Sequence, residues 1–196
     1  MIIGMLKNNM PIFMQGIGKT PFDPRGSKTR INLQNAINPS LFYNETTGDS
    51  DISFLTSGVS KLMQAGILKT GGPDVVFNSA TFSMKKAAAA TGTMQAMHWS
   101  PSGSRVSAIV SLTTFSTSYT DISFTFTGSP RLFRIGDRIV VRWSSGTWTT
   151  DGVNNPFIEN DSATTTTNYS LTTSSTSSNL SWTDDSTQSP VLSVDA

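Results

Sequence analysis

Apolar and polar side chains alternate every second residue over most of the chain after about residue 50. In "DVVFNSATFSMKK" (74–86), Val76, Ala80, Phe82 and Met84 fall on one side, and serine or threonine on the other. Comparable segments bounded by Gly, Pro, Asn, Asp or Ser are 51–58, 61–70, 91–99, 104–112, 120–128, 137–143, 164–173, 179–182 and 189–196. This regular spacing of about ten strands predicts an all-β, antiparallel sandwich that is jelly-roll-like.

The segments between these strands predict loops and tight reversals. "MKKAAAATG" (84–92) is too short to hold as an isolated helix, so we expect a loop or a single turn. The Gly and Pro of "SPSGS" (100–104) and "TGSPR" (127–131) predict antiparallel pairs over 92–112 and 120–143. The Ser/Thr-rich stretch 162–189 is predicted to form polar-faced strands, because threonine is β-branched.

Residues 1–48 are predicted to form an extended, irregular arm, and residues 49–196 the sandwich domain. Four prolines in this region prevent a long helix or a central strand. Its apolar residues need a cover, either the chain's own domain or, as we favour, a neighbouring subunit. The residues expected to carry this assembly role are Ile2, Ile3, Ile12, Phe13, Met14, Arg25 and Arg30.

Charge is unevenly distributed, although the formal net charge is only +1. Residues 1–40 hold five basic residues against Asp23, a net of +4, whereas residues 143–196 hold six acids and no Lys or Arg. This asymmetry can steer copies of the chain together. The basic residues are too dispersed for a nucleic-acid site.

The short apolar start predicts neither a secretory signal nor a membrane span, so we expect synthesis in a host cytoplasm.

The stretch "RLFRIGDRIVVRWSSGTW" (131–148) concentrates arginine and tryptophan. Its alternation predicts a turn at Gly136 and Asp137, followed by a strand with one buried and one cationic face. The cationic side is predicted to form an arginine–carboxylate seam with the acidic C-terminal region, with anionic glycan binding or plain solvent exposure as alternatives. The seam residues are Arg131, Arg134, Arg138 and Arg142.

Two segments within about 75–145 resemble β-sandwich modules of the carbohydrate-binding and concanavalin-like type. In such modules a lysine-containing loop leads into a Thr-Gly-Thr strand, and an F-x-F strand precedes L-x-x-G-D-x-I-x-V. The matching residues are Phe82, Lys85, Thr91, Gly92, Thr93, Phe124, Phe126, Phe133, Gly136, Asp137, Ile139 and Val141. The resemblance implies a jelly-roll-like fold, as found in adhesion modules and in viral tail, fibre and decoration proteins, without implying an active site.

The sequence offers little catalytic or metal-binding chemistry. The chain has no cysteine and one histidine, His98, which we expect to be structural. Its only glutamates, Glu45 and Glu159, lie in no recognisable cleft, and the pair Asp184–Asp185 fits an ordinary turn better than a calcium site. We therefore predict no catalytic residue, no metal and no cofactor.

Tryptophans in strands usually belong to a core or an interface, with a glycan platform as the alternative. The candidates for such a platform are Trp143 and Trp148.

Together these features predict a non-enzymatic structural protein of a virion from a bacterial or archaeal virus. Its expected partners are other virion proteins and copies of itself, as a homo-oligomer. The alternatives are a carbohydrate-binding adhesion module that contacts surface glycan and, more weakly, a glycan-degrading enzyme.

Overall fold

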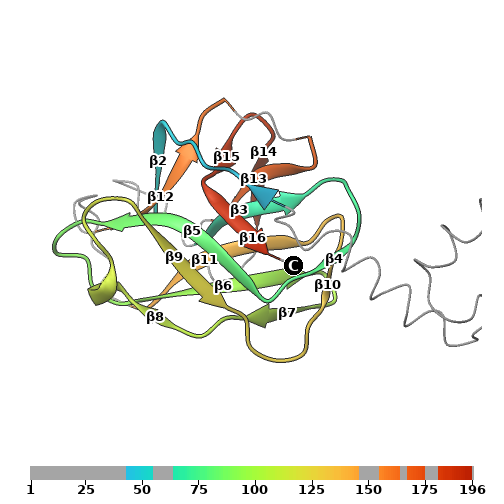
Figure 1. Ribbon diagram of the computed structural model, residues 1–196, viewed down its shortest axis with the longest axis horizontal. Helices are drawn as coiled ribbons and strands as arrows, with labels where there is room; N and C mark the ends of the chain where they lie inside the picture. Colours follow the sequence, from blue (N-terminus) through green and yellow to red (C-terminus); the bar gives the residue numbers. More distant parts are fainter. Residues whose placement is uncertain (1–42, 55–63, 146–154, 164–166, 175–180, 196) are drawn as a thin grey trace, which may run out of the picture. The chain divides into compact units, whose positions relative to one another are not determined.

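The computed structural model describes residues 43–54, 64–145, 155–163, 167–174 and 181–195. These residues form an antiparallel β-sandwich, as the sequence predicts, with two sheets and a small two-stranded ribbon (Figure 1). Within them the only helical element is a 3₁₀ turn, Leu112–Thr114. The sandwich lies within the compact unit Leu41–Ala196.

Sheet I is built around β5, which pairs with β9 along one edge and with β16 and β12 along the other. Its strands are β1 (Tyr43–Asn44), β2 (Ser50–Ser53), β5 (Ser79–Lys86), β9 (Thr120–Thr125), β12 (Pro156–Asp161), β15 (Ser189–Pro190) and β16 (Leu192–Asp195).

Sheet II is built around β11, which lies between β3 and β6. Its strands are β3 (Gln64–Lys69), β6 (Thr93–Ser100), β7 (Gly103–Val106), β8 (Val110–Ser111), β11 (Arg138–Ser145), β13 (Tyr169–Ser174) and β14 (Trp182–Asp185). The two-stranded ribbon joins β4 (Val75–Val76) to β10 (Leu132–Phe133).

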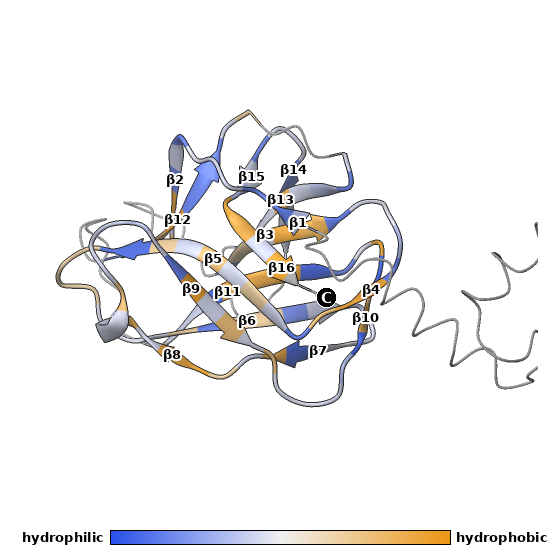
Figure 2. Cartoon of the chain, viewed as in Figure 1, coloured by the Kyte–Doolittle hydropathy of each residue, from blue (hydrophilic) through white to orange (hydrophobic). Residues whose placement is uncertain are grey.

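The core lies between the inner faces of the two sheets. Side chains at alternate positions fill it, for example Phe82 and Met84 from β5 and Ile139, Val141 and Trp143 from β11, all at most 1% exposed. Figure 2 shows the corresponding apolar segments along β3, β5, β11 and β16. The period-two pattern thus predicts the inward face of these strands correctly.

The structure corrects several details of strand pairing. The segments β9 and β11 were expected to pair in one hairpin, but β9 pairs with β5 in sheet I and β11 belongs to sheet II. Val76 lies on β4, outside the alternation of β5, and is 38% exposed. β12 was not predicted at all. Residues 84–86 of the segment 84–92 belong to β5, and the rest contains a single turn, closed by the Ala90 N–H donating to the Ala87 carbonyl.

The last residues of the predicted arm belong to the sandwich. β1 pairs with β16, and Tyr43 is a buried core residue whose hydroxyl donates to the Pro190 carbonyl at 3.0 Å. A two-residue strand is too short to show a periodic signal in the sequence. The rest of the arm lies outside the described residues, together with Ile2, Ile3, Ile12, Phe13, Met14, Arg25 and Arg30.

Sheet II requires a glycine at the centre of β3. Gly66 faces Val140 across the ladder, and a Cβ built on Gly66 would lie 1.9 Å from the Ile139 carbonyl oxygen. The three nearest atoms all belong to the backbone of β11, so no side-chain rotation can relieve the contact.

We therefore predict that Gly66→Ala costs more than about 2 kcal/mol of unfolding free energy, measured by urea denaturation. The control is Gly128→Ala, where φ is +82° but no atom lies within 4 Å of the added Cβ. That control should lose only about 1 kcal/mol, through the left-handed backbone. Equal losses in the two variants would contradict the packing argument.

Candidate functional site

A tight turn connects β10 to β11 and carries Arg134, and a second predicted arginine, Arg131, lies just before β10. The turn runs from Arg134 to Asp137, and the Asp137 N–H donates to the Arg134 carbonyl at 2.9 Å. Gly136 has φ of +90°, the conformation that the third residue of a type II turn requires. The sequence prediction of a turn at Gly136 and Asp137 matches this geometry.

The Asp137 carboxylate holds this turn against sheet II. Its Oδ2 accepts from the Arg134 N–H and from His98 Nε2, both at 3.0 Å, and Asp137 is only 5% exposed. The backbone adds two further bonds to the end of β3: Lys69 N–H to the Asp137 carbonyl, and Gly136 N–H to the Lys69 carbonyl, both at 2.9 Å. The turn is therefore tied to β6 and to β3 at the same point.

His98 is a structural histidine within the core. It is completely buried, and its ring lies between Phe77 and Phe133, with centroid distances of 5.2 and 5.4 Å. Burial lowers the pKa of His98, and the positive charges of Arg131 and Arg105 lower it further, against an opposing effect of Asp137. The neutral ring donates from Nε2 to Asp137, while Nδ1 has no partner.

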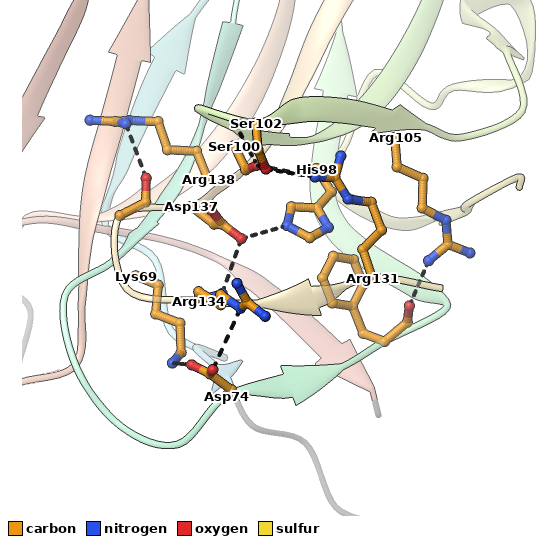
Figure 3. Close-up of polar contacts among 12 residues, drawn as sticks. Lys69, Asp74, His98, Ser100, Ser102, Arg105, Arg131, Arg134, Asp137 and Arg138 are labelled. Carbon is orange, nitrogen blue, oxygen red and sulfur yellow. Dashed lines mark hydrogen bonds and ion pairs between the residues drawn. The ribbon is translucent and has the colours of Figure 1, made fainter. Parts of the chain in front are cut away.

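Two buried cations lie near the turn and bind mainly carbonyl groups (Figure 3). Lys69 is fully buried, donates to the Gly72 carbonyl at 3.1 Å and lies 3.8 Å from the Asp74 carboxylate. Desolvation by burial lowers the pKa of Lys69. Arg105 is 6% exposed and donates to the carbonyls of Phe77, Phe126 and Thr127 at 2.9 to 3.1 Å. This end of the sandwich therefore holds more positive charge than its carboxylates neutralise.

A cleft of about 580 Å³ opens beside this turn, and we call it the arginine cleft. Arg131 donates from Nη2 to Ser102 Oγ at 3.0 Å and to Ser100 Oγ at 3.3 Å. Arg134 is 66% exposed, with a long ion pair of 3.7 Å to Asp74. The lining residues are Ser100, Pro101, Ser102, Pro130, Arg131, Leu132, Arg134, Ile135 and Asp137.

The arginine cleft combines positive charge with exposed apolar side chains. Ile135 is 63% exposed and Leu132 42%, and Val76 pairs with Leu132 across the ribbon. Four cations, namely Lys69, Arg105, Arg131 and Arg134, stand against two carboxylates, Asp74 and Asp137, a net of +2 with His98 neutral. Such a surface suits a partner that presents carboxylates around an apolar or aromatic group.

The four predicted seam arginines have different partners. Arg138 meets the acidic C-terminal region, because its Nη2 lies 2.9 Å from Asp184. Arg142 instead donates to the Gln95 side chain at 2.6 Å. Arg131 binds serine hydroxyls and Arg134 pairs with Asp74, so the four do not form one continuous seam. Only Arg138 and Arg142 lie on β11, whereas Arg134 lies in the turn before it and Arg131 precedes β10.

The tryptophans also separate into buried and surface residues. Trp143 is 1% exposed and donates its indole N–H to the Thr91 carbonyl at 3.1 Å, so its ring faces are closed to a glycan. Trp148 lies outside the described residues.

Trp99 and Trp182, which are not among the predicted platform residues, are half-buried on the outer face of sheet II, with ring centroids 5.6 Å apart. The Arg138 guanidinium lies over both rings. Because successive side chains of a strand point to opposite faces, Trp99 lies on the outer face when its neighbour His98 faces inward. This alternation could have been read from the sequence.

A second cleft, of about 430 Å³, lies on the outer face of sheet I, and we call it the acidic cleft. Its lining includes Glu45, Asp121 and Glu159 and no Lys or Arg. Glu159 accepts from Ser83 Oγ at 2.5 Å, and Glu45 accepts from the N–H groups of Thr46 and Thr47. Tyr119 also lines it and donates to the Asp51 carboxylate; burial, and after it this hydrogen bond, raises the pKa of Tyr119.

Asp184 and Asp185, which were expected in a turn, instead lie in β14 and pair with β13, and both carboxylates are bound within the protein. Asp184 pairs with Arg138, and Asp185 accepts from the Thr187 N–H and hydroxyl and from the Gln188 side chain. In the described part of the chain, no three acidic or histidine side chains come together as metal ligands would. None of the described segments forms a helix that could span a membrane.

Comparison with known proteins finds no matching protein family, no matching curated protein and no matching solved structure.

The lowered pKa of His98 makes a prediction for stability against pH. The unfolded chain binds the proton more tightly than the folded chain, so stability falls as pH drops below about 6.5, by up to about 1.4 kcal/mol per pH unit. Urea unfolding at pH 7.5, 6.5 and 5.5 should show this loss in the parent protein and a smaller loss in His98→Gln. Because His98 is the chain's single histidine, the comparison isolates it. The same pH dependence in both proteins would contradict the assignment.

Proposed function

We propose that this protein is a non-enzymatic structural component of a virus particle, as a capsid decoration, tail or fibre protein of a bacterial or archaeal virus. In this proposal it self-associates or docks on neighbouring subunits. The N-terminal arm proposed from the sequence and the arginine cleft supply the contacts. A small all-β sandwich with rigid, exposed contact groups is suited to such a role.

The observation that carries the proposal is the arginine cleft itself. Arg134, Leu132 and Ile135 are exposed, yet the turn that bears them is fixed by the buried Asp137 carboxylate. Arginine and exposed apolar side chains are the groups that protein interfaces favour. Because the turn is already ordered, binding a partner would not cost the conformational entropy of ordering it.

The titratable groups around the cleft support binding rather than catalysis. His98 is buried between two phenylalanine rings, and Asp137 Oδ2 already accepts two hydrogen bonds, from His98 and from the Arg134 N–H. The Ser100 and Ser102 hydroxyls bind each other and Arg131. These groups position the arginines, and none is poised next to a general base at the surface.

The location on a particle is tested by immunogold electron microscopy of particles recovered from the source, with an antibody raised against the purified chain. We expect regularly repeated label on particles and none with pre-immune serum. Label confined to soluble material would overturn the proposal.

A carbohydrate-binding adhesion module is the second candidate, and it is favoured by the half-buried pair Trp99 and Trp182. Aromatic rings on an outer sheet face can stack on sugar rings, although Arg138 already covers part of both. This pair takes the place of Trp143, whose ring is buried.

A glycan array separates the two candidates. If the protein is a structural component, the parent chain should give no signal that depends on Trp99. Glycan binding that is lost in Trp99→Ala, and retained in Ile109→Ala at a 60% exposed apolar position, would establish the second candidate instead.

A further inference from the structure

We infer that the arginine cleft of one copy docks into the acidic cleft of a second copy, so that the sandwich associates head to tail. This inference rests on the proposed function and identifies the partner of the arginine cleft. It uses only residues that the structure describes, independently of the N-terminal arm.

The two clefts are complementary in charge. The lining of the arginine cleft presents Arg131 and Arg134. The lining of the acidic cleft presents Glu45, Asp121 and Glu159 without a basic residue. Lys85 does not reduce this charge, because it is paired with Asp51 at 2.8 Å.

The two arginines of the arginine cleft and Asp121 of the acidic cleft remain available to a partner, whereas Glu45 and Glu159 already accept hydrogen bonds within the chain. Arg131 forms no ion pair with a described residue, and the Arg134 pair to Asp74 is long, at 3.7 Å, and solvent-exposed. In the acidic cleft Asp121 is exposed on β9, an edge strand that pairs only with β5. Guanidinium groups pair with carboxylates through two parallel N–H groups, so arginine suits this contact better than lysine.

The clefts also match in their apolar parts. Leu132 and Ile135 are the exposed apolar groups of the arginine cleft. The half-buried Tyr119 ring in the lining of the acidic cleft carries Lys85 Nζ at 4.3 Å from its centroid, and its remaining exposed surface is where they can pack. Burial of these side chains would add affinity to a contact that charge alone would mainly orient.

The contact has to be intermolecular. The two clefts have no lining residue in common, and they belong to one folded sandwich, the arginine cleft to the β6–β7 and β10–β11 connections and the acidic cleft to the outer face of sheet I. A surface that binds a different surface on an identical copy generates a ring or a filament.

Two charge-reversed variants of the full chain test the pairing. One carries Arg131→Glu and Arg134→Glu, and the other carries Glu45→Lys and Asp121→Lys. Glu159 is left unchanged because it binds Ser83 and packs against Gly48. Thr125→Lys, an exposed position on β9 outside the cleft, is the control for added charge.

The parent and the control should form multimers by light scattering and sedimentation, with an apparent Kd that rises at least tenfold between 50 and 500 mM salt as the charges are screened. Each reversed variant alone should be monomeric. An equimolar mixture should associate again, because each mixed contact pairs opposite charges. Circular dichroism and unfolding midpoints establish whether the variants are folded. If a double variant does not fold, the single exchanges Arg134→Glu and Asp121→Lys repeat the test.

Monomers in the parent, multimers in both variants alone, or a mixture that stays monomeric would each overturn the pairing. Loss of association only in the acidic-cleft variant would also overturn it and would favour the basic segment 1–40 as the occupant. None of these results bears on immunogold labelling of particles, so failure of this contact is distinguishable from failure of the proposed function.

Discussion

The buried Asp137 carboxylate is the interaction on which the described end of the sandwich depends. It accepts from the Arg134 N–H and from His98, so one side chain links the turn before β11 to the neighbouring strand β6. A buried carboxylate without donors would be strongly destabilising, whereas one with two donors defines a single geometry. The position of the arginine cleft is therefore set by contacts in the core. The exposed residues of the turn are held in place because the turn is anchored to buried groups.

The same constraint explains the charge of that surface. Lys69 and Arg105 are buried and donate mainly to carbonyl groups; Arg105 has no carboxylate partner among the described residues, and the Lys69 ion pair with Asp74 is long, at 3.8 Å. Carbonyl dipoles stabilise such cations where solvent cannot. The field of these buried cations adds to that of Arg131 and Arg134, and burial together with the charges of Arg131 and Arg105 disfavours a charged His98. An anionic partner would complete a charge balance that the fold leaves open.

The sequence predicts the sandwich, the inward faces of β5 and β11, and the turn at Gly136, because period-two alternation and a glycine at positive φ are local signals. It does not predict β12, whose Pro156, Asn160 and Asp161 look like a loop, although Asn160 is buried and binds Ser50 and Gln188 through its side chain. Nor does it show which strands pair, since His98 meets Asp137, and Asp74 meets Arg134, only through tertiary contacts. The clefts are assembled from segments that are distant in the sequence. The sequence could therefore indicate the individual arginines, but not the residues with which each one pairs.

The position of the two clefts constrains what kind of assembly the sandwich can build. A contact between unlike surfaces repeats with the same rotation at every step, so it closes into a ring only if that rotation divides a full turn. The chain ends of the described region add a second constraint: β1 and β16 pair beside the acidic cleft, and Asn44, Thr46 and Ser193 line it. A neighbour seated there would therefore contact the point where the N-terminal segment enters the sandwich.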